Sequence, residues 1–157
     1  MKVKLIKIND KIYPNSLKLI SKPPQSLYLL GNEENLNNSG IAIIGSRNYT
    51  EYGKKYALKF SKELAKQGIN IISGMALGID RFAHEGALNV GGNTIAVLGS
   101  GFNHIYPEEN IDLFNLILKN NGTIISEYPP NVKPDSKNFP ERNRIVSGLA
   151  NGVLVIE

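Results

Sequence analysis

Apolar residues gather in five short runs from residue 40 onward, and more polar stretches separate them. Each run is rich in Ile and Val and does not alternate with polar residues, which is typical of strands buried on both faces of a parallel sheet. The runs are IAII from residue 41, INII from 69, TIAVL from 94, TIIS from 123 and GVLVIE from 152. The pattern therefore predicts a parallel sheet.

Helical stretches lie between these runs. In the first of them Tyr56, Phe60 and Leu64 fall on one side and most of the lysines on the other, and Gly68 stands where a helix C-cap glycine is common. Alternating strands and helices predict a doubly wound, mostly parallel α/β sheet with helices on both faces. The predicted helical stretches cover residues 51–68, 78–92 and 107–122.

Residues 1–39 do not follow this pattern. Pro23 and Pro24 interrupt any helix there, although a helix within 14–21 and a short strand at SLYLL are compatible with the sequence. We expect a lead-in segment, 1–39, beside a main domain, 40–157. The chain stops at VLVIE, at the end of a predicted strand, so this strand lies at an edge or the domain continues in a longer protein. We expect the domain to be incomplete at its C-terminal end.

Composition narrows the classes of protein further. A chain of 157 residues fits one domain with a real core. It has no cysteine, which excludes disulfides and thiolate metal sites, and no apolar run long enough to span a membrane. The first residues do not have the composition of a signal peptide, so we expect a cytoplasmic protein. The formal net charge of +4 permits an anionic partner without requiring one.

Small residues follow three successive predicted strands. In an open parallel sheet, ligands bind where the strands end, and small residues there let a ligand approach the backbone. Amide groups at the following helix N-termini attract anions. Each turn alone could simply be a tight connection, but three turns together with an arginine favour an anion site. The predicted residues are Gly45, Ser46 and Arg47 after the first strand and Gly74, Ala76, Gly78 and Asp80 after the second, with a third turn at Gly99, Ser100 and Gly101.

A second cluster precedes the last predicted strand. It combines cationic side chains, amides and an aromatic ring, which can bind phosphates, read base edges and stack on a base. The alternative is a solvated helix start with its phenylalanine in the core. The lysines of 51–68 fit the solvated face of a helix, with Lys54 and Lys55 nearest the predicted site. The cluster consists of Lys137, Asn138, Phe139, Arg142, Asn143 and Arg144.

The sequence offers binding groups but no evident reactive group. It has no G-x-x-x-x-G-K-[ST] loop and no G-x-S-x-G elbow. His84 and His104 lack metal-ligand spacing, and we expect His84 to pack between a helix and the sheet or to hydrogen-bond a loop. Asp80 is expected to cap a helix or brace the loop 74–78 through backbone N–H groups. We therefore expect no catalytic residue, no metal and no cofactor.

Five ordered motifs identify a family. They are IAIIGSRNYTEYG, IISGMALGIDRFAHEGAL, TIAVLGSGFNHIYPEEN, IISEYPP and NFPERNRIVSGLANGVLVIE. Over roughly residues 12–157 the chain resembles the DNA-processing protein A (DprA/Smf) family. The resemblance implies a Rossmann-like domain that binds single-stranded DNA without enzymatic activity, in natural transformation and in loading the RecA recombinase, usually as a homodimer. The family continues beyond the last strand present here.

The same resemblance assigns roles to the residues in both clusters. Ser46 and Arg47 would be phosphate ligands, the loop from Gly74 to Asp80 would form a wall of the site, and the segment 138–144 would contact the strand. One alternative is an enzyme or sensor for a small nucleotide, related to the lysine decarboxylase-like phosphoribohydrolases. Their P-G-G-x-G-T-x-x-E motif is absent from this chain.

Overall fold

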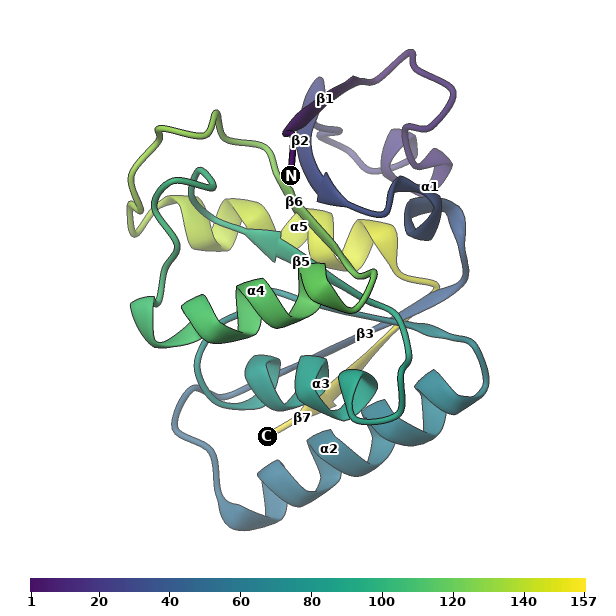
Figure 1. Ribbon diagram of the computed structural model, residues 1–157, viewed down its shortest axis with the longest axis vertical. Helices are drawn as coiled ribbons and strands as arrows, with labels where there is room; N and C mark the ends of the chain where they lie inside the picture. The colour runs from purple at the N-terminus through teal and green to yellow at the C-terminus, as the bar shows by residue number, and fades with distance from the viewer.

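The computed structural model describes residues 1–157, which form one seven-stranded sheet covered by helices on both faces (Figure 1). The strand order is β1-β2-β6-β5-β4-β3-β7, and the five strands from β6 to β7 run parallel. This confirms the doubly wound, mostly parallel fold and all five predicted strands. The strands are β1 (Lys4–Lys7), β2 (Ser26–Gly31), β3 (Gly40–Gly45), β4 (Asn70–Ser73), β5 (Thr94–Leu98), β6 (Thr123–Ser126) and β7 (Gly152–Ile156).

The helices divide between the two faces of the sheet. Leu17 of α1 and Ile145 of α5 share one apolar cluster with sheet residues, whereas α2, α3 and α4 contribute to two clusters on the opposite face. The helices are α1 (Asn15–Lys18), α2 (Glu51–Lys66), α3 (Ile79–Leu88), α4 (Ile111–Lys119) and α5 (Asn138–Leu149), with short 3-10 helices η1 (Glu33–Asn37) and η2 (Glu108–Asn110).

The first 39 residues extend the sheet. β2, which contains SLYLL, pairs antiparallel with β6, and β1 pairs antiparallel with β2. Tyr13 and Leu17 are fully buried beneath α5. The Tyr13 hydroxyl donates to the carbonyl of Pro24 at 2.6 Å, and burial, with the Glu127 carboxylate nearby, raises the pKa of Tyr13 to about 12. This segment therefore completes the core on the α5 face.

Helix α2 packs through a different face from the one its large residues suggest. Its buried positions are small residues at four-residue spacing: Gly53, Ala57, Ser61 and Ala65. This stripe lets α3 approach closely, since a Cβ on Gly86 would lie 2.8 Å from the Leu58 carbonyl and from the Ser61 Cβ. Tyr56 and Phe60 lie outside, beside the lysines of the same helix, so the predicted separation of apolar and lysine faces is wrong.

The last strand, β7, lies at the edge of the sheet and pairs only with β3, from Ile41↔Gly152 to Gly45↔Ile156. Its Val153 and Val155 side chains are exposed. No helix in the structure combines the length and the apolar character that crossing a bilayer requires.

Candidate nucleic-acid interface

The predicted glycine turns meet at one edge of the sheet, where β3, β4 and β5 end. Three adjoining hollows lie there, and Arg47 and Arg142 line all of them. We call this depression the rim hollow. Its other lining residues include Gly45, Gly74, Ala76, Asp80, Phe139 and Asn143, all predicted from the sequence, and Tyr106.

The loop from Gly45 to Arg47 rests directly on the start of α3. The Ser46 carbonyl accepts a hydrogen bond from the Ile79 amide at 3.2 Å. Gly78 has a φ of +79°, and a Cβ there would lie 2.4 Å from the Ser46 carbonyl oxygen. The Ser46 hydroxyl turns back on its own loop, accepting from the amide of Asn48 and donating to its carbonyl, both at 3.0 Å. Only glycine at position 78 permits this contact.

Arg47 carries the exposed charge of the rim hollow. Its side chain pairs with no carboxylate in the protein. The guanidinium carbon lies 5.8 Å from the centroid of the Phe139 ring, which is a cation–π distance. The guanidinium is therefore positioned by a ring while its hydrogen-bond donors stay free for an anion.

Arg142 also lies beside the Phe139 ring, but unlike Arg47 it is buried. Its exposed fraction is 5%, its guanidinium carbon also lies 5.8 Å from the Phe139 centroid, and Nη1 donates to the carbonyls of Gly74 and Val97, both at 2.6 Å. A Cβ on Gly74 would lie 2.7 Å from Cζ, so that glycine makes room for the guanidinium. Burial lowers the pKa of Arg142, and the Arg47 charge lowers it further, while the Asp80 charge opposes both. Nη2 donates to no protein group and remains available.

Asp80 braces the loop after β4, as predicted. Its Oδ2 accepts from the amides of Gly74 at 3.1 Å and Ala76 at 3.4 Å. Burial raises the pKa of this carboxyl, while the Arg142 charge and the two amide hydrogen bonds act in the opposite direction. The carboxyl and the guanidinium of Arg142 thus hold the ends of β4 and β5 in a fixed arrangement.

The aromatic part of the rim hollow comes from two elements. Phe139, at the start of α5, is partly buried over Gly99, where a Cβ would lie 2.8 Å from its ring. The exposed Tyr106 lies with its centroid 5.4 Å from that of Phe139. Gly99, in the predicted turn after the third strand, thus leaves room for the Phe139 ring. No sequence pattern singled out Tyr106, because it lies in an irregular loop between β5 and η2.

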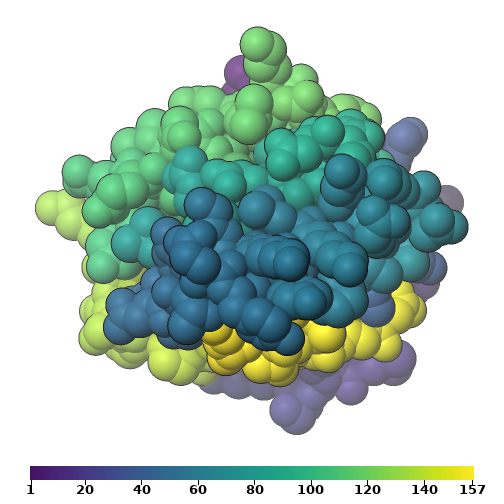
Figure 2. Space-filling view, turned by 90° about the horizontal axis from the view of Figure 1, so that it is seen from below, coloured from purple at the N-terminus to yellow at the C-terminus, as the bar shows by residue number.

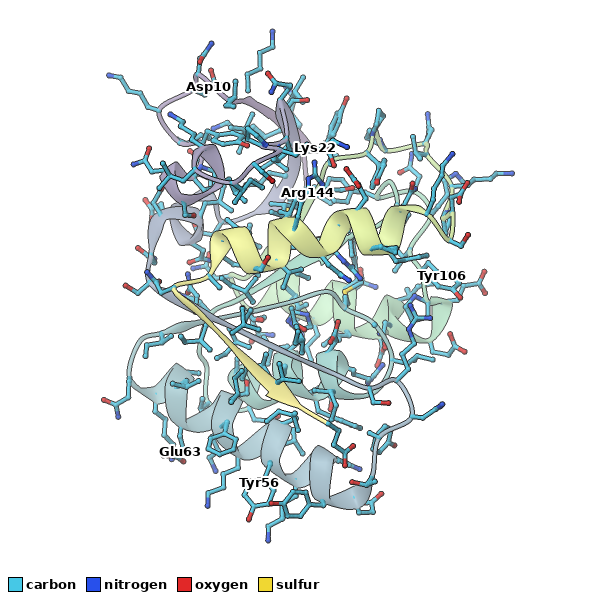
Figure 3. All side chains as sticks on the ribbon, turned by 180° about the vertical axis from the view of Figure 1, so that it is seen from behind. Asp10, Lys22, Tyr56, Glu63, Tyr106 and Arg144 are labelled. Carbon is cyan, nitrogen blue, oxygen red and sulfur yellow. The ribbon has the colours of Figure 1, made fainter.

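Arg144 lies apart from the rim hollow, contrary to the expectation that it would join Arg47. Its exposed fraction is 19%, Nη2 pairs with the Glu127 carboxylate at 2.7 Å, and Nε donates to the carbonyl of Lys22 at 3.0 Å. Figure 3 shows Arg144 beside Lys22, on the side of α5 that faces the N-terminal segment, and Tyr106 away from both. Positions 142 and 144 are two residues apart on a helix and therefore point to different sides.

Three other predicted residues differ in accessibility. The Lys137 side chain is exposed and its ammonium lies 3.8 Å from the Asp135 carboxylate. Asn138 is buried at the first turn of α5, where its amide donates to the Asp135 carbonyl. Asn143 is exposed, and its Oδ1 accepts from Arg142 Nε at 3.1 Å.

Several amide groups expected to be free for anions are occupied by the chain's own groups. The Thr50 amide, at the N-terminus of α2, donates to the Glu157 carboxylate at 2.9 Å, and the Thr50 hydroxyl bonds to the same group. The Thr50 hydroxyl and amide lower the pKa of Glu157. The Asp80 carboxylate likewise accepts from the Gly74 and Ala76 amides, so these three amides are not free to bind an anion.

His84 is fully buried between α3 and the sheet, as predicted. Its Nδ1 lies 2.6 Å from the Thr94 hydroxyl, which itself donates to the carbonyl of Ile71 at 2.7 Å. Burial, with a contribution from the Arg142 charge, lowers the pKa of His84 to about 3. No group of three or more His, Asp or Glu side chains in the structure could hold a metal ion.

A doubly wound sheet with a cationic, aromatic hollow at the carboxyl ends of its parallel strands defines a Rossmann-like domain. The chain belongs to the DNA recombination-mediator protein A family, whose model matches residues 4–157.

Known relatives agree with this assignment. The chain is 45% identical to protein Smf of Synechocystis over 153 residues, which cover 95% of this chain and 38% of that protein. It superposes on DNA processing protein A (DprA) of Streptococcus pneumoniae with a TM-score of 0.92 and 38% identity, covering 100% of this chain and 55% of that one. For the Helicobacter pylori protein, whose structure describes a single-stranded DNA binding mode, the values are 0.88 and 33%, with coverage of 99% and 69%. The chain thus spans about half or less of the length of these curated relatives.

Proposed function

We propose that this chain is the single-stranded DNA-binding part of a non-enzymatic recombination mediator. The observation that carries the proposal is the pair of guanidinium groups whose central carbons each lie 5.8 Å from the centroid of the Phe139 ring, with Arg47 free of carboxylates. The single-stranded DNA binding described for the H. pylori relative supports the choice of ligand.

Each group of the rim hollow has a part in this binding. Arg47 holds a phosphate through its fork of N–H donors, because guanidinium geometry matches phosphate oxygens. A base lies on the exposed surface of Phe139 and Tyr106, since stacking suits every base and needs no sequence. Arg142 adds positive potential from below and one free Nη2 group. Asn143 lies at the same opening.

The remaining expectations from the family resemblance are proposed as well. We propose binding without catalysis because the Asp80 carboxyl, which is buried in the rim hollow, accepts hydrogen bonds from two amides and so holds the loop after β4 in place. Assembly as a homodimer, transfer of DNA to the RecA recombinase in natural transformation, and action in the cytoplasm follow from the family resemblance and are proposed with it.

Titration of a fluorescent oligothymidylate by anisotropy tests the proposal. We expect Arg47→Ala to weaken binding by about 1 kcal/mol, roughly fivefold, because one partly solvated charged hydrogen-bond contact is lost. The slope of log K against log salt should fall by about 0.7, the value for one phosphate contact on a single strand.

Lys119→Ala is the matched control, because it removes one exposed charge at the end of α4. It should leave both the affinity and the salt slope near the wild-type values. Equal oligonucleotide affinity for wild type and Arg47→Ala at low salt would contradict the proposal. Tight binding of a nucleoside monophosphate without binding of the oligonucleotide would favour the nucleotide enzyme or sensor instead.

A further inference from the structure

Helix α2 presents a row of aromatic rings to solvent. Tyr52, Tyr56 and Phe60 follow one another at four-residue spacing, with centroids 4.5 Å and 5.8 Å apart. Tyr52 is 69% exposed and Phe60 40% exposed. We call these three side chains the aromatic ridge. Figure 2 shows α2 as the outermost layer of this face, and Figure 3 shows Tyr56 pointing away from the sheet.

The aromatic ridge does not serve the core. The stripe of small residues, on a different side of α2, makes the contact with α3, so the helix is anchored without these rings. Clustered exposed rings on a soluble surface mark an interaction site more often than chance packing, because they keep apolar area in water.

Lysines accompany the rings along the whole ridge. The ammonium groups of Lys55 and Lys59 lie 5.7 Å and 5.8 Å from the Tyr56 centroid. Neither of these lysines, nor Lys62 in the next turn, has a carboxylate within ion-pair distance, whereas Lys66 pairs with Glu63. Unpaired ammonium groups beside ring faces fit a ligand that offers both phosphates and planar bases.

The ridge continues from the rim hollow. Arg47 and Tyr52 are five positions apart, so their Cα atoms are at most about 17 Å apart even in an extended chain. The exposed Tyr49 lies between them, with its ring 4.7 Å from Phe82 at an interplanar angle of 84°. The segment 47–62 thus carries cations and rings from the rim hollow to the middle of α2, with one acidic residue, Glu51, among them.

We propose that the aromatic ridge is a second single-stranded nucleic-acid contact, along which a strand continues after it leaves the rim hollow. Bases stack on the rings of Tyr52 and Phe60, and the ammonium groups of Lys55, Lys59 and Lys62 bind the phosphates. The inference rests on the proposed function of the rim hollow, and it adds a length dependence that the rim hollow alone does not give.

The test compares labelled oligothymidylates of about six and about twenty nucleotides, a range that spans common single-strand site sizes. We expect the wild-type chain to bind the longer strand more tightly than statistical repetition of one site explains. Tyr52→Ala with Phe60→Ala should weaken binding of the longer strand about tenfold or more, as loss of base stacking does elsewhere. Binding of the short strand should change less than about twofold, because the rim hollow suffices for it.

A charge variant and its control separate the phosphate contacts from net charge. Removing the three ridge lysines should lower the salt slope for the longer strand by about 2, or about 0.7 for each contact. A control that removes three exposed lysines elsewhere should leave that slope nearly unchanged. The ridge variant is Lys55→Gln, Lys59→Gln and Lys62→Gln, and the control is Lys2→Gln, Lys11→Gln and Lys119→Gln.

The outcomes distinguish this inference from the function on which it rests. If the wild-type chain binds neither strand, the rim-hollow proposal itself is wrong. If it binds both, and the ridge variants keep the full advantage of the longer strand, the rim hollow stands and the ridge contact is refuted. If sedimentation shows a wild-type dimer that the ring variant abolishes without any effect of strand length, the ridge is an interface between copies, which also overturns the proposal.

Discussion

The buried His84 should make the stability of this protein depend on pH in a particular direction. Its pKa is about 3 in the folded chain, against an ordinary value of about 6.5. Thr94 donates to the Ile71 carbonyl, so its oxygen accepts from His84 Nδ1–H, and Nε2 has no partner. A proton on Nε2 would therefore be a buried, unpaired donor beside the positive potential of Arg142.

The size of the effect follows from linkage. Below about pH 6.5 the unfolded chain takes up a proton at His84 that the folded chain refuses, so stability falls as the pH drops from about 6.5 to about 3. Between about pH 7 and about pH 5 this group alone should lower the free energy of unfolding by about 2 kcal/mol. Asp80 acts with the opposite sign, because burial raises its pKa, and its stabilising contribution is lost as pH rises through the folded value.

Urea unfolding of wild type and His84→Gln at the two pH values isolates the effect, since the Asp80 contribution is common to both. Glutamine can still donate to Thr94 but does not titrate. We expect the pH-induced loss of stability to be about 2 kcal/mol smaller in His84→Gln than in wild type. His104→Gln, at the only other histidine, should keep the wild-type difference. An identical pH dependence in wild type and His84→Gln would refute the reasoning.

Two substitutions test how the rim hollow is held. Gly78→Ala should cost about 2 kcal/mol or more of stability and weaken oligonucleotide binding, because the residue has positive φ and its Cβ would displace the backbone of Ser46 and Arg47; unchanged melting and binding would show that this loop is free to move. Arg144→Gln should lower the free energy of unfolding by about 1–2 kcal/mol, since it leaves the Glu127 carboxylate unpaired, and should hardly change oligonucleotide affinity; weaker binding with an unchanged melting temperature would instead make Arg144 a DNA contact.

Strands β3 to β6 were predictable because they are largely buried on both faces of the sheet, and β7 was predictable from its apolar run although Val153 and Val155 are exposed. Continuous Ile and Val runs that alternate with helical stretches predict parallel strands, and all five runs form parallel strands in the structure. The polar strand KLIK, β1, gave no such signal, because it is four residues long and pairs only with β2. Only Ile6 of this strand is buried, so β1 lacks the continuous apolar run that marks the other strands.

The orientation of α2 was unpredictable for a different reason. Hydrophobic periodicity weighs large side chains, whereas this helix is fixed by close approach through Gly53, Ala57, Ser61 and Ala65. The roles of the arginines had the same limit. The predicted fold brought Arg47, Arg142 and Arg144 to one candidate site, but only the backbone carbonyls around Arg142 and the carboxylate beside Arg144 decide which guanidinium stays free.

The apolar cluster under α5 has a consequence for anyone who would transplant this binding surface. Side chains from the β1–β2 hairpin and from α1 fill the same cluster as Ile145 and Leu149, and α5 carries Phe139 and Arg142 at its other end. A graft that contains only the parallel strands and their helices would remove the side chains of β1, α1 and β2 against which α5 packs. The smallest transplantable module therefore includes the β1–β2 hairpin. This hairpin does not line the rim hollow, but it supports α5, the helix that carries Phe139.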